Sequence, residues 1–182
     1  MRRSIQQIAE LAYKLLAKIP ITSYPIKLDE VTNFLNIKVV SRDLGEEVSG
    51  MLVFKEDGPV IGVNSNEYIL RRRFTIAHEI GHYVLGHHNN GLFVENSPFY
   101  RNKASSTGEV TQEVEANAFA AALLMPEHLL RPAYLKATEN GKINHRDEDA
   151  FELVIKDLAR DFQVSKLAMS IRLGNLMLFE NF

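Results

Sequence analysis

The chain has 182 residues, of which 46% are hydrophobic and 24% charged, the composition of an ordinary globular protein long enough to bury a substantial core. Its 21 Lys and Arg residues against 23 Asp and Glu residues give a formal net charge of −2, which excludes a generally basic nucleic-acid-binding protein. It has no cysteine, which excludes disulfide scaffolds, zinc fingers, iron–sulfur clusters and thiol nucleophiles. A bound metal ion must therefore be held by His, Asp or Glu.

The first residues are basic, but the sequence that follows them is amphipathic and lacks the continuous apolar run of a secretory signal. The longest apolar stretch, residues 118–125, is much shorter than the roughly 18 residues of a membrane span. We therefore expect a cytoplasmic protein without a membrane segment.

The pattern of apolar residues predicts an α+β fold, with strands early in the chain and most helices late. Ser4 and Ser165 are expected to cap helices, and Asp57-Gly58 is expected to join two strands in a hairpin of a small, mostly antiparallel sheet. Residues 96–108 are polar and are expected to form a loop. The predicted helices are residues 4–18, 29–35, 67–87, 109–124, 127–136, 147–160 and 165–173, and the predicted strands are residues 37–40, 50–55 and 59–63.

The most informative motif is His78-Glu79-Ile80-Gly81-His82. Two His residues four positions apart lie on one face of a helix, so both imidazoles can reach one metal ion, and zinc suits such ligands. Glu79 lies beside the pair and could take a proton from a water bound to that ion. The sequence around the motif is apolar, and a buried His or Glu needs a partner or a metal, which favours the metal site over incidental histidines.

A catalytic zinc needs a third protein ligand, for which we consider three residues. Glu113 is the first candidate, because Asn117 lies four positions later on the same helical face and could orient a metal-binding His. Glu115 points about 160° away from Glu113 on a helix with 3.6 residues per turn. His88 lies six residues after His82, but the Gly expected at the intervening turn is missing, because Gly86 comes one position late.

Two segments of the sequence resemble the ImmA/IrrE family of metallopeptidases. They are residues 73–82, RFTIAHEIGH, and residues 113–126, EVEANAFAAALLMP. Residues 158–173, LARDFQVSKLAMSIRL, are also similar, and so is Ser49-Gly50-Met51. The resemblance covers nearly the whole chain.

The resemblance implies a gluzincin-like, zincin-type protease fold in which His78, His82 and Glu113 bind zinc, with manganese as the alternative metal, and Glu79 is the catalytic glutamate. It also implies a narrow endopeptidase that cleaves a helix-turn-helix, Xre-type repressor of mobile-element, prophage or stress genes. Some family members act instead as the toxin of a toxin–antitoxin pair, and a metal-binding regulatory partner without protease activity is a further alternative.

Three further expectations concern the remaining parts of the chain. Residues 1–136 should form the metallopeptidase domain and residues 137–182 a helical subdomain. The last helix carries only Lys166 and Arg172 as positive charges, so direct nucleic-acid binding is not expected. His87 and His88 are expected to cap the end of the helix that carries the motif.

Overall fold

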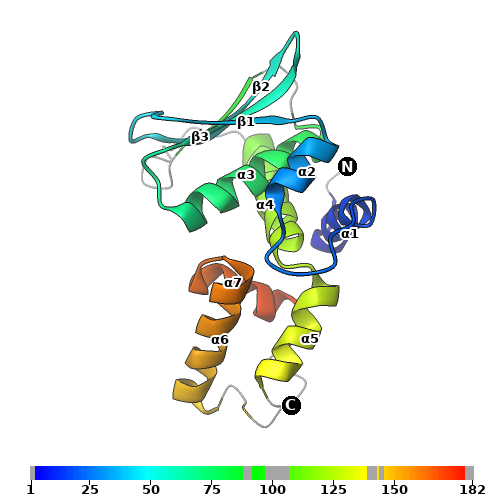
Figure 1. Cartoon of the computed structure of the whole chain (residues 1–182), viewed down its shortest axis with the longest axis vertical. Coiled ribbons are helices and arrows are strands. Elements are labelled where there is room, and N and C mark those ends of the chain that lie inside the picture. The colour runs from blue at the N-terminus through cyan, green and yellow to red at the C-terminus, as the bar shows by residue number, and fades with distance from the viewer. Residues whose placement is uncertain (1–2, 88–91, 97–106, 139–142, 144–145, 179–182) are drawn as a thin grey trace.

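The computed structural model describes residues 3–87, 92–96, 107–138, 143 and 146–178, and within 92–96, and at positions 107 and 109, the backbone alone. These residues form an α+β fold, as the sequence predicts (Figure 1). The helices are α1 (Ile5–Leu16), α2 (Leu28–Phe34), α3 (Ile69–Leu85), α4 (Thr107–Leu124), α5 (Glu127–Ala137), α6 (Glu148–Phe162) and α7 (Lys166–Asn175), and the strands are β1 (Lys38–Arg42), β2 (Val48–Lys55), β3 (Gly58–Asn64) and β4 (Leu92–Asn96).

The predicted helix caps are present at both ends of the chain. The Ser4 hydroxyl accepts a hydrogen bond from the Gln7 amide at 3.2 Å, and the Gln7 side chain accepts one from the Ser4 amide at 2.9 Å. This reciprocal pair satisfies amides that have no partner within α1. The Ser165 hydroxyl likewise accepts from the Ala168 amide at 3.1 Å at the start of α7. Both predictions are confirmed.

The strands form one sheet in the order β1-β3-β2-β4. β2 pairs antiparallel with β3 and β4, whereas β1 pairs parallel with β3, so the sheet is mostly antiparallel, as predicted. Lys55 pairs with Gly58 across the predicted hairpin, and Gly58 has the positive φ of 120° that the turn requires. β4 was not predicted from the sequence; it is a strand of five residues that is defined by its pairing with β2.

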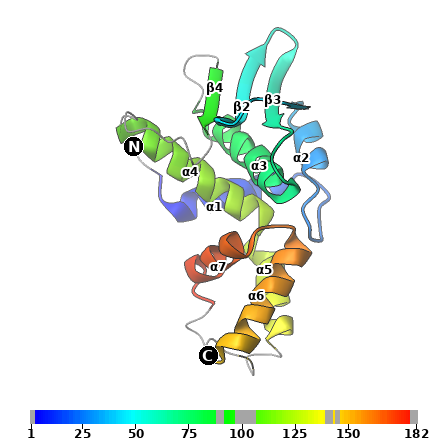
Figure 2. The same ribbon diagram turned by 90° about the vertical axis from the view of Figure 1, so that its left-hand side faces the viewer.

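Two glycines allow close packing between the sheet, α3 and α4. α3 lies between the sheet and α4, as Figures 1 and 2 show. A Cβ atom at Gly81 would lie 3.1 Å from the Ala116 carbonyl oxygen and 3.2 Å from the Phe119 Cβ, so a side chain there would push α3 and α4 slightly apart. A Cβ atom at Gly50 would overlap Thr75 Cγ2, so β2 can lie directly on α3 only with glycine there.

α5, α6 and α7 lie together below the sheet and the metal-motif helix (Figure 1). Arg172 in α7 is buried and joins this part to the rest of the chain. Its Nε donates to the Met125 carbonyl at 3.1 Å, and its Nη2 donates to the Tyr13 hydroxyl at 2.6 Å. The division of the chain at residue 137 stays a prediction.

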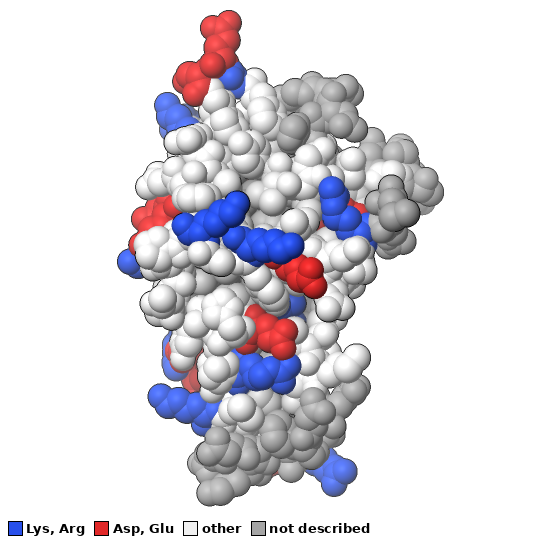
Figure 3. Space-filling model, turned by 90° about the vertical axis from the view of Figure 1, so that its right-hand side faces the viewer, with Lys and Arg blue, Asp and Glu red and all other residues white. Residues whose placement is uncertain are grey.

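The surface of the described residues is mixed in charge on the face shown in Figure 3. Acidic and basic side chains alternate there among uncharged ones, so this face has no extended patch of one sign. No helix in the part of the chain that the structure describes has the length and apolar character needed to cross a lipid bilayer.

The close approach at Gly81 predicts the effect of adding a side chain. An Ala in the interior of a helix normally stabilises it by about 1 kcal/mol relative to Gly. At Gly81 we expect Gly81→Ala to lose this gain and Gly81→Val to lower the free energy of unfolding by about 1–3 kcal/mol, because the added atoms meet α4. Urea denaturation measures both values.

Gly174 supplies the matched control, because it is an exposed glycine in α7. Gly174→Ala should raise the free energy of unfolding, as helix propensity alone predicts. Equal stabilisation by Gly81→Ala and Gly174→Ala would contradict the close packing of α3 on α4.

Candidate metal centre

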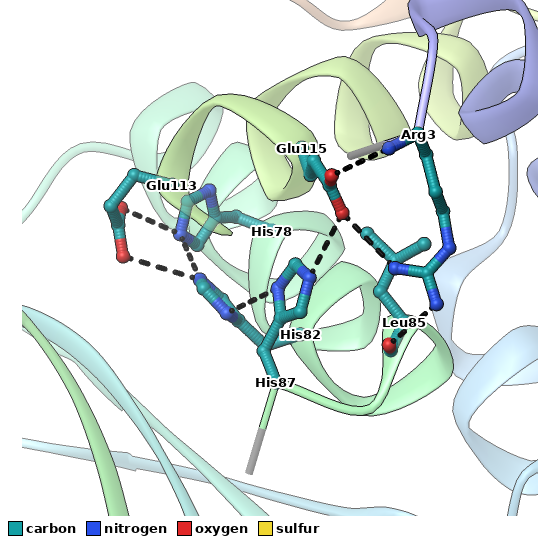
Figure 4. A network of polar contacts seen from close by, with 7 residues as sticks. All are labelled: Arg3, His78, His82, Leu85, His87, Glu113 and Glu115. Atoms are coloured by element: carbon teal, nitrogen blue, oxygen red, sulfur yellow. Dashed lines mark hydrogen bonds and ion pairs between the residues drawn. The ribbon is translucent and has the colours of Figure 1, made fainter. Parts of the chain in front are cut away.

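The structure brings His78 and His82 of α3 together with Glu113 of α4 (Figure 4). The two Nε2 atoms lie 2.9 Å apart, and each lies 3.4 Å from one oxygen of the Glu113 carboxylate. All three ligand atoms lie within 4.8 Å of one another. Among the described residues, Glu113 is thus the candidate third ligand that lies beside the two histidines. The three residues together could hold one metal ion.

The opposite ring nitrogen of each histidine faces a hydrogen-bond partner. His78 Nδ1 lies 3.0 Å from Asn117 Oδ1, and His82 Nδ1 lies 3.2 Å from His87 Nδ1. An amide oxygen can only accept, so the contact with Asn117 requires a proton on His78 Nδ1 and leaves the lone pair of Nε2 directed at the centre. This is the orienting contact that the spacing of Glu113 and Asn117 predicts.

Burial keeps the His82 imidazole neutral. His78 and His82 are fully buried, and burial lowers the pKa of His82 from 6.5 to about 4. Burial raises the pKa of Glu113, but the contacts with His78 and His82 outweigh this effect and hold that pKa well below its usual range. At neutral pH the His82 ring is therefore a neutral nitrogen donor beside an ionised Glu113 carboxylate.

This donor set fits a divalent metal ion such as zinc. Two neutral imidazoles and a carboxylate are the protein ligands of many catalytic zinc sites. The two Nε2 lone pairs point at each other across 2.9 Å with the carboxylate beside them, an arrangement that a cation between the three groups stabilises. The side chain of Glu113 is 26% exposed, whereas both imidazoles are fully buried, so the centre opens to solvent on the Glu113 side.

Glu79, the predicted base, is fully buried on the side of α3 that faces β2. A Cβ atom at Gly50 would lie 3.3 Å from Glu79 Oε1, so the glycine leaves the carboxylate room against the strand. The catalytic role of Glu79 stays a prediction.

Glu115 does not join the metal group. Its Oε2 lies 3.1 Å from Arg3 Nη1 and 3.2 Å from His87 Nε2, on the side of α4 that faces the end of α3. His87 is buried, and its side chain contacts His82 and Glu115, so the expectation that its ring caps the end of the helix is wrong. His88, the other alternative ligand, lies outside the described residues.

The role of His87, Glu115 and Arg3 around the centre was not predicted from the sequence. The signal that could have found His87 is Gly86, which ends α3 with a φ of 74°. A left-handed residue at this position turns the chain back over the last helical turn. The His87 amide accordingly donates to the His82 carbonyl at 3.0 Å, which places the His87 ring beside the His82 ring.

Comparison with known protein families matches residues 33–174 to the IrrE N-terminal-like domain, Peptidase_M78. The chain belongs to this family. The resemblance to ImmA/IrrE metallopeptidases is thereby confirmed, and the matched segment of the Peptidase_M78 chain runs from α2 to α7 and contains the whole His-His-Glu group.

Two relatives add to the family match. "Uncharacterized immunity region protein 2" of Bacillus phage phi105 is 33% identical over 98 residues, which are 54% of this chain and 58% of the phage protein. A solved structure of a Mycobacterium tuberculosis transcriptional regulator covers 91% of the chain with a TM-score of 0.57 and 17% identity. The chain spans 46% of that regulator, and the likeness shows a shared fold.

The buried imidazoles make the metal-free Peptidase_M78 chain sensitive to acid. The pKa of His82 is about 4 in the folded chain and 6.5 as its ordinary value, so between these pH values the unfolded chain binds the extra proton. The free energy of unfolding should therefore fall as the pH drops from about 6.5 to about 4, by up to about 3 kcal/mol from this residue. The lowered pKa of Glu113 extends the fall below its ordinary value of 4.5.

Urea denaturation at a series of pH values measures this dependence. His82→Gln should make the slope between pH 6.5 and 4 shallower, because it removes the titrating group. His128→Gln changes an exposed histidine and should leave the slope as it is in the unmodified protein. An identical slope in His82→Gln and the unmodified protein would show that His82 does not titrate as described.

Proposed function

We propose that the chain is a zinc-dependent endopeptidase of narrow specificity that cleaves a helix-turn-helix, Xre-type repressor. The observation that carries the metal site is the meeting of two Nε2 atoms and one carboxylate within 4.8 Å on two helices that pack together at Gly81. Membership of a metallopeptidase family supports peptide hydrolysis as the reaction at that site.

In this proposal His78, His82 and Glu113 hold the metal ion, and Glu79 is the general base. Zinc held there would act as a Lewis acid able to polarise the scissile carbonyl and to lower the pKa of a water at the site to about 7. Glu79 accepts the proton of the attacking water and later passes it to the leaving amine. Its buried position beside β2 suits this task, because a carboxylate that is excluded from bulk water does not lose the accepted proton to solvent before the amine leaves.

The sheet offers a place for an extended substrate. In the described sheet β4 pairs with β2 on one side, so its other edge faces outward and could pair with a peptide strand. The centre opens on the side of Glu113, near the beginning of α4. We propose that a substrate strand paired with β4 reaches the metal group from this side. Residues 97–106, part of the predicted loop, lie outside the described residues.

A repressor is the substrate that the relatives favour. The phage relative is described as an immunity-region protein, and the solved structure with the same fold is a transcriptional regulator. These descriptions concern the relatives, and they support a role of this chain beside a gene regulator. A toxin that is restrained by such a regulator is the main alternative, and the experiment below separates the two.

The test is a cleavage assay with the purified chain, zinc and the helix-turn-helix regulator encoded beside it. We expect a single cut, read by intact mass, which a chelator abolishes. Glu79→Gln should lower the rate by about 10²–10⁴-fold, because only the general base is lost, and should bind zinc as the unmodified chain does. Zinc content is measured on the same samples by elemental analysis.

Glu127→Gln is the control for a change of one carboxylate, because Glu127 lies in α5 and pairs with Arg131 there. It should cleave at the unmodified rate. An equal rate in Glu79→Gln would remove Glu79 from the mechanism. Intact regulator together with a zinc-loaded chain would favour a toxin or a non-proteolytic partner, and complex formation and growth on expression would then be measured.

A further inference from the structure

A chain of hydrogen bonds leads from the metal centre to the segment before α1 (Figure 4). His82 Nδ1 lies 3.2 Å from His87 Nδ1, and His87 Nε2 lies 3.2 Å from Glu115 Oε2. Arg3 closes the chain, because its backbone amide donates to Glu115 Oε1 at 3.2 Å and its Nη1 donates to Oε2 at 3.1 Å. His82, His87 and Glu115 are all buried.

For two neutral imidazoles, the donors and acceptors in this chain assign the position of each proton. Arg3 always carries its charge, and an ionised carboxylate beside it offers acceptors only. His87 must therefore donate from Nε2 to Glu115, and a neutral His87 then accepts at Nδ1. The donor that meets this acceptor is His82 Nδ1–H, which leaves His82 Nε2 without a proton. That atom is the one that faces His78 and Glu113.

We propose that Arg3, Glu115 and His87 form a positioning relay that holds His82 in its metal-binding tautomer before any metal arrives. The inference rests on the metal-centre part of the proposed function and is independent of the peptidase reaction and its substrate. Asn117 makes the corresponding contact with His78 in a single step. For His82, the proton is held on Nδ1 by three residues, which come from three separate segments of the chain.

The backbone around the relay fits this role. Gly86 turns the chain so that His87 lies over the last turn of α3, and Arg3 Nη2 donates to the Leu85 carbonyl at 3.3 Å just before that turn. Arg3 thus ties the end of α3 and Glu115 of α4 to one guanidinium group. A fixed ligand ring loses less freedom on binding, which raises metal affinity.

The first test needs no variant. Long-range ¹⁵N–¹H NMR of the metal-free protein reports the tautomer of each histidine. We expect His82 to carry its proton on Nδ1 and His87 on Nε2. A metal-free protein in which His82 carries its proton on Nε2 would overturn the proposal, whatever the metal affinity or the peptidase activity turns out to be.

The second test measures zinc affinity by competition with a chromophoric chelator. His87→Leu removes the acceptor and should weaken zinc binding by about 10–100-fold, whereas His87→Asn keeps an oxygen near the position of Nδ1 and should restore much of the affinity. Glu115→Gln leaves one acceptor oxygen where Arg3 and His87 share two, so it should also weaken binding and populate the other tautomer of His82. His128→Leu, at an exposed histidine in α5, is the control and should bind as the unmodified chain does.

Urea denaturation of the metal-free variants separates positioning from folding. If His87→Leu fails to fold, zinc affinity is compared between Glu115→Gln, His87→Asn and the unmodified protein. The His82 tautomer of the unmodified protein is then the second measurement. Folded variants with unchanged zinc affinity and an unchanged His82 tautomer would overturn the relay. Failure of the unmodified chain to bind zinc would instead count against the proposed metal centre, so the two failures are distinguishable.

Discussion

The contact between α3 and α4 at Gly81 is the constraint on which the rest of the site depends. His78 and His82 are carried by one helix and Glu113 by the other, so the separation of the two helices sets the size of the metal group. A Cβ atom at Gly81 would lie 3.1 Å from the Ala116 carbonyl oxygen. The same approach brings Asn117 to His78, and it places Glu115 against the end of α3.

Burial of the centre is unfavourable for stability and favourable for metal binding. Two imidazoles and an adjacent glutamate in the interior require polar partners, and the burial that lowers the pKa of His82 also keeps its ring neutral at physiological pH. Asn117 and His87 supply acceptors for the ring protons. The interior thus presents nitrogen lone pairs in place of charges, and a metal ion bound there would supply the missing stabilisation.

Local sequence patterns were sufficient for much of the fold and for the residues that meet in the centre. Ser4 and Ser165 cap helices because capping depends on a few neighbouring residues, and His78 and His82 share a face because helical periodicity is local. β4 escaped prediction because a strand of five residues depends on pairing with β2.

The relay shows why the remaining part of the site could not be read from spacing. Helical geometry places Glu115 away from the metal, and the structure agrees, but geometry on one helix does not reveal what the far face meets. The partners of Glu115 are His87, which a left-handed Gly86 turns back, and Arg3, which is 112 positions away in the sequence. In the proposed relay, Glu115 is a poor metal ligand but still affects how well His82 binds the metal. Through His87, it holds the proton of His82 on the ring nitrogen opposite the metal-binding one.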